Sequence, residues 1–127
     1  MSRFLWICFA GALGTGMRYL VGLGAARLFG PAFPYGTLTV NLVGCFLISA
    51  VAYVAFTTKL VPPTLQFALT TGFIGGLTTY SSFNFETTKM LQERAFGSAA
   101  LYFVMTVGGC LLAGSLGVVA AKRMFDA

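Results

Sequence analysis

Long apolar stretches separated by short polar breaks set the pattern of this chain. Charged residues and prolines divide it into four apolar segments, at about residues 4–28, 35–57, 64–89 and 97–121. A helix needs about 20 apolar residues to cross a bilayer core about 30 Å thick. The pattern therefore predicts an all-α integral membrane protein, with residues 1–127 forming a single domain of four transmembrane helices.

Composition agrees with a lipid environment. The chain is 57% hydrophobic and 9% charged, whereas soluble proteins carry about 25% charged residues. A signal peptide would also begin with an arginine before an apolar stretch, but three comparable segments follow the first one, which favours a transmembrane helix. We therefore expect a multi-pass protein of the lipid bilayer.

The charged and sulfur-containing residues exclude several other classes of protein. The net charge is +5, but the basic residues are scattered singly except for Lys122 and Arg123, so no basic stripe for nucleic acid forms. There is no histidine, and Cys8, Cys45 and Cys110 lie in apolar segments without metal-ligand spacing, as small residues of the membrane core do. No phosphate loop, dinucleotide fingerprint or acid–base pair is present, which argues against an enzyme.

The loop charges do not decide the orientation in the membrane. The side with more Lys and Arg in its short loops stays in the cytoplasm. One side has four basic residues and the other has three: Arg3, Lys59, Lys122 and Arg123 against Arg27, Lys89 and Arg94. Two alternatives remain open. Either the chain inserts both ways and pairs with an inverted copy, or one charge, such as that of Arg18, fixes a single orientation.

The second segment has a polar residue near its centre. Asn41 lies there, and Thr37 is one turn earlier on the same helix face. An amide in a membrane helix either holds helices together through hydrogen bonds or binds a ligand. Because the amide NH₂ donates hydrogen bonds without carrying a formal charge, Asn41 and Thr37 are candidates for the wall of an ion pathway.

The third segment carries an aromatic and polar stripe. Tyr80 and Phe83 are three residues apart, so both rings project from one helix face, and Glu86 continues this face toward the helix end. The stripe is either a packing ridge or the wall of a pathway. Thr79 and Ser81 add hydroxyls beside it, which a packing surface does not require.

Two polar residues of the fourth segment add another edge. They are Tyr102 and Thr106, four positions apart. Together with the other candidates they offer hydroxyls, an amide and the positive edges of aromatic rings, all without formal charge. Such weak, repeated donors suit an anion, because a lysine in a narrow pore would hold a small anion too tightly to release it.

The sequence GGLTT at residues 75–79 is suited to break the third helix in its middle. Interrupted helices at membrane depth are tolerated where the freed backbone lines a cavity or binds an ion. The freed carbonyls of Gly75 and Thr78 would offer two oxygens to a hard cation, and an inverted second copy would bring the number to four. The alternative is that glycines spaced as Gly72 and Gly76 serve only close helix packing.

Four blocks of the sequence resemble one known family. They are GALGTGMRY at residues 11–19, GTLTVNLVGCF at 36–46, GFIGGLTTYSSF at 72–83, and the glycine-rich fourth segment. The second and third blocks, in this order and in so short a chain, are highly specific. On these residues the chain is identified as a member of the Fluc, or CrcB, fluoride channel family of microbes.

The resemblance implies a function, an oligomeric state and a bound ion that the residues alone do not establish. Members of this family are passive channels of the bacterial inner membrane that export fluoride from the cytoplasm through two pores in an antiparallel, dual-topology homodimer. The resemblance also implies a structural sodium ion at the dimer interface, held by the carbonyls of Gly75 and Thr78 of both copies. The pore asparagine of the family matches Asn41, and its paired phenylalanines match Tyr80 and Phe83.

Further positions follow from the same resemblance. Four residues look by position like members of the polar wall: Thr37, Ser81, Tyr102 and Thr106. Glu86 is similar to an acidic residue near the pore end, and Arg18 matches the arginine of the first-helix motif, whose role is left open. The family usually has phenylalanine where this chain has Tyr80, and the added phenol bears on conductance rather than on identity.

Two other functions compete with a fluoride channel. A four-helix multidrug exporter needs a membrane-embedded carboxylate to couple protons to a cationic drug, and this chain has no acidic residue before Glu86. An inert assembly subunit would use Asn41 and the aromatic stripe only for packing. Fluoride efflux from liposomes distinguishes the three functions.

The near-equal loop charges predict that the chain inserts in both orientations. A tag on the C-terminus should be found on both sides of the membrane, and two lysines added to one loop should trap one orientation and abolish the activity of the pair. Accessibility of the tag to protease in intact and opened vesicles measures this. A C-terminus found only on the cytoplasmic side of an active protein would contradict the prediction.

Overall fold

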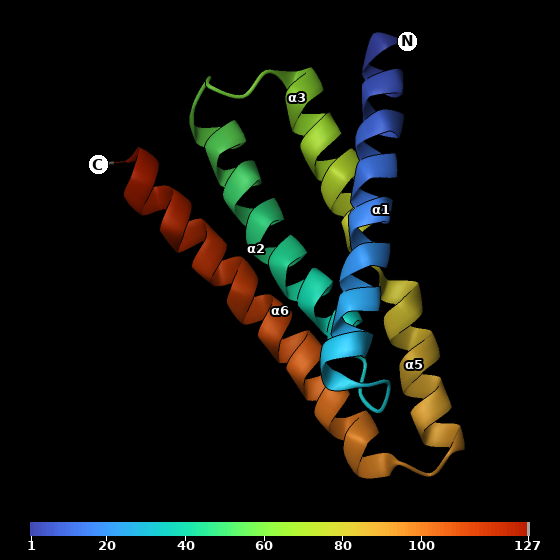
Figure 1. Ribbon diagram of the computed structural model, residues 1–127. Coiled ribbons are helices and arrows are strands. Elements are labelled where there is room, and N and C mark those ends of the chain that lie inside the picture. Colours follow the sequence, from blue (N-terminus) through green and yellow to red (C-terminus); the bar gives the residue numbers. More distant parts are fainter. Residues whose placement is uncertain (127) are drawn as a thin grey trace.

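The computed structural model describes residues 1–126, and helices make up most of them (Figure 1). Three helices, α1 (Ser2–Phe29), α2 (Tyr35–Thr57) and α6 (Phe96–Phe125), are long and apolar enough to cross a membrane. The third segment forms four shorter pieces: α3 (Pro63–Phe67), the π-helix η1 (Ala68–Ile74), α4 (Gly75–Leu77) and α5 (Tyr80–Gln92). The predicted all-α architecture, with four segments and a broken third, is confirmed.

Glycine and proline mark the helix ends. The first helix, α1, ends at Gly30, whose φ of 79° is a left-handed conformation that glycine adopts without steric penalty. Pro34 immediately precedes α2, and Pro63 is the first residue of α3, where the missing N–H of proline leaves no helical bond unmade. The short connection between α1 and α2 leaves these helices as neighbours that run in opposite directions (Figure 1).

The third segment is interrupted at Thr78 and Thr79, whose backbones are extended, with ψ of 155° and 111°. The break predicted within GGLTT is therefore confirmed. Gly75 and Gly76 stay helical, in α4. Gly76 serves close packing, since a Cβ on it would lie 2.4 Å from the carbonyl oxygen of Gly11 in α1. The segment thus combines a break, formed by the threonines, with close packing, which the glycine permits.

The backbone of α1 lies directly against η1 and α4. A Cβ on Gly14 would lie 2.0 Å from the Phe73 carbonyl oxygen, and one on Gly72 would lie 2.8 Å from the Ile7 carbonyl oxygen. Small residues at helix contacts are the usual basis of association in lipid, where no hydrophobic force drives helices together. These contacts hold α1 to the half of the third segment that precedes the break.

A second close pair is formed by α2 and α6, which lie side by side along much of their length (Figure 1). A Cβ on Gly117 would lie 2.2 Å from the Phe46 carbonyl oxygen, and one on Gly114 would lie 3.0 Å from the Ser49 hydroxyl oxygen. The glycines of α6 therefore set how closely α2 approaches it.

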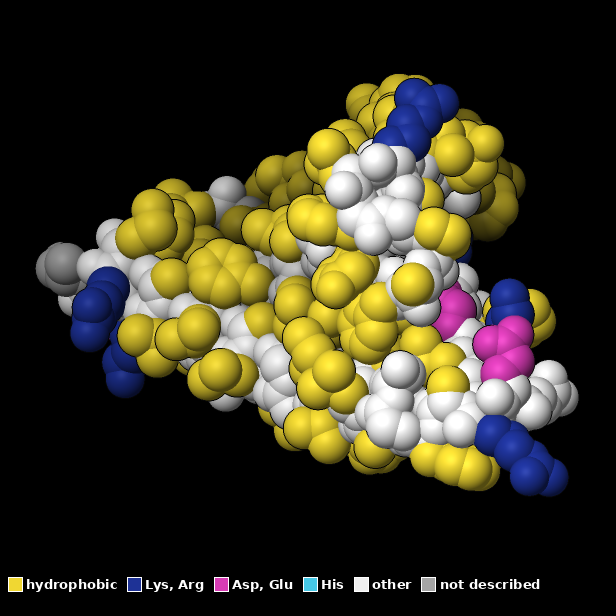
Figure 2. All heavy atoms as spheres, turned by 60° about the horizontal axis from the view of Figure 1, so that its bottom comes forward, with side chains coloured by type: hydrophobic (Ala, Val, Ile, Leu, Met, Phe, Trp, Pro, Cys, Tyr) yellow, Lys and Arg dark blue, Asp and Glu magenta, His cyan; other side chains and the backbone are white. Residues whose placement is uncertain are grey.

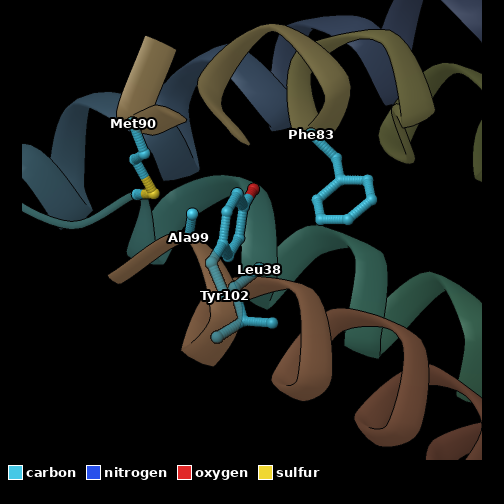
Figure 3. Packing of buried hydrophobic residues seen from close by; sticks show 5 residues of the cluster. All are labelled: Leu38, Phe83, Met90, Ala99 and Tyr102. Atoms are coloured by element: carbon cyan, nitrogen blue, oxygen red, sulfur yellow. The ribbon is translucent and has the colours of Figure 1, made fainter. Parts of the chain in front are cut away.

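A small apolar core joins α2, α5 and α6. It consists of Leu38, Phe83, Met90, Ala99 and Tyr102 (Figure 3). Elsewhere many large apolar side chains are exposed, and Figure 2 shows them spread over one face of the molecule, with Lys and Arg at its margins. A surface of this kind suits contact with lipid, as the predicted membrane helices require.

The backbone contact at Gly117 predicts a difference between two glycines of α6. We expect Gly117→Ala to lower the Tm of the purified protein, because the added methyl meets the backbone of Phe46, and overpacking of this kind costs about 1–3 kcal/mol. In the control Gly108→Ala nothing lies within 4 Å of the new methyl, so the better helix propensity of alanine should keep or raise the Tm. Equal Tm values in detergent would show that the α2–α6 pair does not depend on this contact.

Candidate anion pathway

A cavity of about 290 Å³ lies beside the break, between α2, α5 and α6. It brings together four of the residues predicted to line an anion pathway, which are Asn41, Tyr80, Phe83 and Thr106. The rest of its wall is formed by Cys45, Thr78, Thr79, Val107 and Cys110. None of these side chains carries a formal charge. The cavity therefore has the chemical character that the sequence predicts for a pathway of weak donors.

Asn41 is buried and pairs with the backbone of the break. Its Nδ2 donates to the carbonyl oxygen of Thr79 at 3.1 Å, and its Oδ1 accepts from the amide of Thr79 at 2.8 Å. These two bonds satisfy one residue of extended backbone at a depth where lipid offers no partner. The amide of Asn41 has a second N–H, which these bonds do not use.

The break also changes which groups bond to the carbonyl oxygens of Gly75 and Thr78. In a continuous α-helix, each oxygen would accept from the backbone amide four residues later. The amide of Thr79, four residues after Gly75, donates to Asn41. The amide of Ser82, four residues after Thr78, donates to the Thr79 hydroxyl at 3.1 Å. The carbonyl oxygens of Gly75 and Thr78 are those predicted to bind a cation. Freed carbonyls suit a hard cation, which prefers oxygen ligands.

Arg18, whose role the sequence leaves open, contacts the helix just before the break. Its Nε donates to the carbonyl oxygen of Gly76 at 3.0 Å, which joins α1 to α4. Arg18 also lines a second cavity, of about 400 Å³, together with Thr37 and Thr79. A positive charge thus lies beside a hollow that two other polar residues of the site share.

Aromatic rings form a continuous ladder from the first cavity into the core. Tyr80 and Phe83 meet edge to face with ring centroids 5.7 Å apart, and Phe83 meets Tyr102 in the same way at 5.1 Å. Figure 3 shows Phe83 and Tyr102 reaching from α5 and α6 into the space between these helices. Phe83 is 4% exposed and Tyr102 is 0% exposed, whereas Tyr80 is 77% exposed. In the predicted stripe, Phe83 therefore belongs to the core of the single chain and Tyr80 to its surface.

Glu86 accepts hydrogen bonds at both oxygens of its carboxylate. The Thr37 hydroxyl donates to Oε1 at 2.6 Å, and the Tyr102 hydroxyl donates to Oε2 at 3.1 Å. The structure thus brings together three predicted site residues from α2, α5 and α6. In this arrangement, both hydroxyl protons are directed at a carboxylate and not at an ion in the pathway.

Thr106 and Ser81 differ in what they offer to a ligand. Thr106 is 7% exposed, and among residues 1–126 its hydroxyl is the one buried side-chain polar atom without a hydrogen-bond partner. Ser81 is exposed, and its hydroxyl lies 3.2 Å from that of Thr79, outside the lining of the cavity. Of these two predicted residues, Thr106 is the one that the structure places in the cavity.

Two features of the site were not predicted from the sequence. Thr79 caps α5 by accepting from the amide of Ser82, and its hydroxyl also donates to the Ser82 hydroxyl at 3.1 Å. A threonine is a known signal for a helix start, so the restart at Tyr80 was open to prediction. Cys45 and Cys110, expected to be small residues of the membrane core, line the cavity. No spacing along one chain signals such a contact between two helices.

The chain is similar to a known family and to several known proteins. The family model described as "CrcB-like protein, Camphor Resistance (CrcB)" matches residues 5–118. The chain is 45% identical over 124 residues to the fluoride-specific ion channel FluC of Sorangium cellulosum (strain So ce56), covering 98% of both chains. It is 47% identical over 113 residues to the fluoride-specific ion channel FluC of Anaeromyxobacter sp. (strain K), covering 89% of this chain and 90% of the relative.

A third relative, the fluoride-specific ion channel FluC of Citrifermentans bemidjiense, is 40% identical over 124 residues, which cover 98% of this chain and 100% of the relative. These matches extend over nearly the whole length of the chain and agree with the resemblance seen in its sequence blocks. The chain therefore belongs to the CrcB/FluC fluoride channel family, whose members are multi-pass membrane proteins and not enzymes.

Proposed function

We propose that this chain is a passive channel that lets fluoride leave the cytoplasm. Relatives at 40% to 47% identity are named fluoride-specific ion channels. The observation that carries the proposal is the buried, unpartnered hydroxyl of Thr106, a residue that lines a cavity with uncharged walls. A buried hydroxyl without a partner is unfavourable by about 1–3 kcal/mol, and an anion that accepts its proton would remove this penalty.

Passage through the cavity requires donors that replace the water around fluoride and still release the ion. The hydroxyl of Thr106, the second N–H of Asn41 and the ring edges of Tyr80 and Phe83 are such donors. Because none carries a formal charge, the ion is bound weakly several times in succession. Weak binding at each step permits both access and release.

The far end of the proposed pathway requires an exchange at Glu86. The hydroxyls of Thr37 and Tyr102 donate to this carboxylate. Fluoride can accept hydrogen bonds from these hydroxyls only if their bonds to the carboxylate break, for instance by rotation of the Glu86 side chain. A carboxylate that stays in place repels the anion. We therefore expect the slowest step of passage at this cluster.

The proposal includes an antiparallel homodimer with two pores and a structural sodium ion. The exposed ring of Tyr80 and the hollow beside Arg18 are each suited to be covered by an inverted copy. Gly75 and Thr78 fit as sodium ligands because the amides that would close helical turns on their carbonyls donate elsewhere. Two carbonyls from each copy would give four oxygens, and the ion would join the two broken helices.

The competing functions fit the structure less well. A proton-coupled exporter needs a carboxylate that is free to bind a cationic drug within the membrane. Both oxygens of Glu86 accept hydrogen bonds from neighbours, and Glu93 and Asp126 lie at the ends of α5 and α6. An inert assembly subunit gives no reason for the unpaired donor of Thr106 in the cavity.

Fluoride efflux from liposomes that contain this protein alone tests the proposed function. We expect a fluoride electrode to record efflux down the concentration gradient without ATP or a proton gradient, and without matching efflux of chloride. Efflux that requires a proton gradient would indicate a coupled transporter. Absence of efflux from vesicles that hold folded protein would reject the channel.

The Thr106 hydroxyl gives the most informative variant for this assay. Thr106→Val keeps the shape of the side chain and removes a donor that no group of the described chain accepts, so we expect the Tm to be unchanged or higher. Fluoride efflux should slow by about five- to tenfold, the rate equivalent of one neutral hydrogen bond of roughly 1–1.4 kcal/mol. The control Thr57→Val, at the exposed end of α2, should conduct like the parent. Equal rates for both variants would remove Thr106 from the pathway.

Tyr80 tests whether an aromatic ring is required beside the cavity. Tyr80→Phe keeps the ring that packs on Phe83, so the efflux rate should change only modestly and chloride should remain excluded. Tyr80→Ala removes the ring edge and should slow fluoride strongly. In the control Phe85→Ala, an exposed ring of the same helix is lost and efflux should be kept. A Tyr80→Ala variant with the rate and selectivity of the parent would make the ring a packing element.

A further inference from the structure

Two cysteines lie in the walls of the same two cavities where α2 packs against α6. Because Cys45 and Cys110 both line these cavities, their side chains lie next to each other. They meet because the two backbones approach closely here. A Cβ on Gly114, one turn after Cys110, would lie 3.7 Å from the Cys45 carbonyl oxygen. Cys45 and Cys110 are partly exposed, whereas the third cysteine, Cys8, is exposed on α1.

The pair of thiols borders two cavities. On one side lies the cavity of about 290 Å³ that contains Asn41, Phe83 and Thr106. On the other side, a hollow of about 590 Å³ is lined by residues of α2 and α6 that include Ser49 and Ser115. A small ion therefore has space to reach the sulfur atoms, and an ion bound between them would form part of the wall of the candidate pathway.

We propose that Cys45 and Cys110 form a binding site for a soft, two-coordinate metal ion such as Ag⁺ or Cu⁺. Thiolates select soft ions, and two cysteines on the same cavities supply the pair of sulfur ligands that these ions accept. Within residues 1–126, no group of three or more His, Cys, Asp or Glu side chains is placed to hold a metal, so the pair suits an ion that needs only two ligands.

Binding is an acid–base exchange and involves no oxidation. Two sulfur–metal bonds form, and the two thiols release their protons to water. One Ag⁺ between two thiolates leaves one net negative charge beside the cavity. Like charges a few Å apart repel more strongly in a low dielectric than in water. Silver should therefore block fluoride, a consequence that rests on the proposed function.

Titration of the purified protein with Ag⁺ in chloride-free buffer tests the site without using transport. We expect calorimetry to show one tightly bound Ag⁺ per chain, with release of protons. Cys45→Ser and Cys110→Ser should each lower the affinity by roughly 100-fold or more, because a second thiolate in the same site acts at a high effective concentration. The matched control Cys8→Ser removes a thiol far along the sequence from the pair and should leave the affinity unchanged.

Fluoride efflux from liposomes in the same buffer separates this inference from the channel itself. Efflux before silver is added tests the channel. Loss of efflux on addition of Ag⁺, with recovery on addition of dithiothreitol and resistance in both serine variants, supports a site on the pathway. If only one of the two substitutions lowers the affinity for Ag⁺, a single thiol binds the ion and the pair is not a site. Full efflux with Ag⁺ bound would place the pair off the pathway and leave the channel function intact.

Discussion

The pairing of Asn41 with Thr79 is the interaction on which the rest of the structure depends. A helix that breaks at membrane depth frees N–H and C=O groups, and lipid offers nothing to bond them. The Asn41 amide satisfies both backbone groups of Thr79, at 3.1 Å and 2.8 Å. Thr79 then caps α5 through Ser82. One buried amide thus lets the chain end one helix and start another within two residues.

A break is stable only if both half-helices are held. The half before it is fixed to α1, through glycine contacts such as that of Gly14 with Phe73 and through the bond from Arg18 to Gly76. The half after it is fixed through the ring of Phe83 in the core of α2, α5 and α6. The cavity lies at the break between these two attachments. Its shape is therefore set by how the two half-helices pack against their neighbours.

The sequence contains enough to predict the four segments, the position of the break and the grouping of Asn41, Tyr80, Phe83 and Thr106 around one site. Hydrophobic length predicts the segments, the glycines and threonines of GGLTT predict the break, and the uncharged donor chemistry together with the family resemblance groups the four residues. The partners of the polar side chains could not be predicted. The bonds from Arg18 to Gly76, from Thr37 to Glu86 and from Tyr102 to Glu86 join residues 58, 49 and 16 positions apart. A period shows which residues share a face, but not which faces meet or in what register.

The hydrogen bonds separate the polar groups that hold the fold from those that can serve an ion. The amide of Asn41 and the Nε of Arg18 are bonded to backbone, so replacing either side chain acts on the break before it acts on an ion. The hydroxyls of Thr37 and Tyr102 are intermediate, because they donate to the carboxylate of Glu86 and not to backbone. Among the described residues, Thr106 has the one buried side-chain polar atom that makes no hydrogen bond within the fold. A loss of transport after a change at Asn41 would therefore not show that this residue touches fluoride, whereas a loss at Thr106 with unchanged stability would.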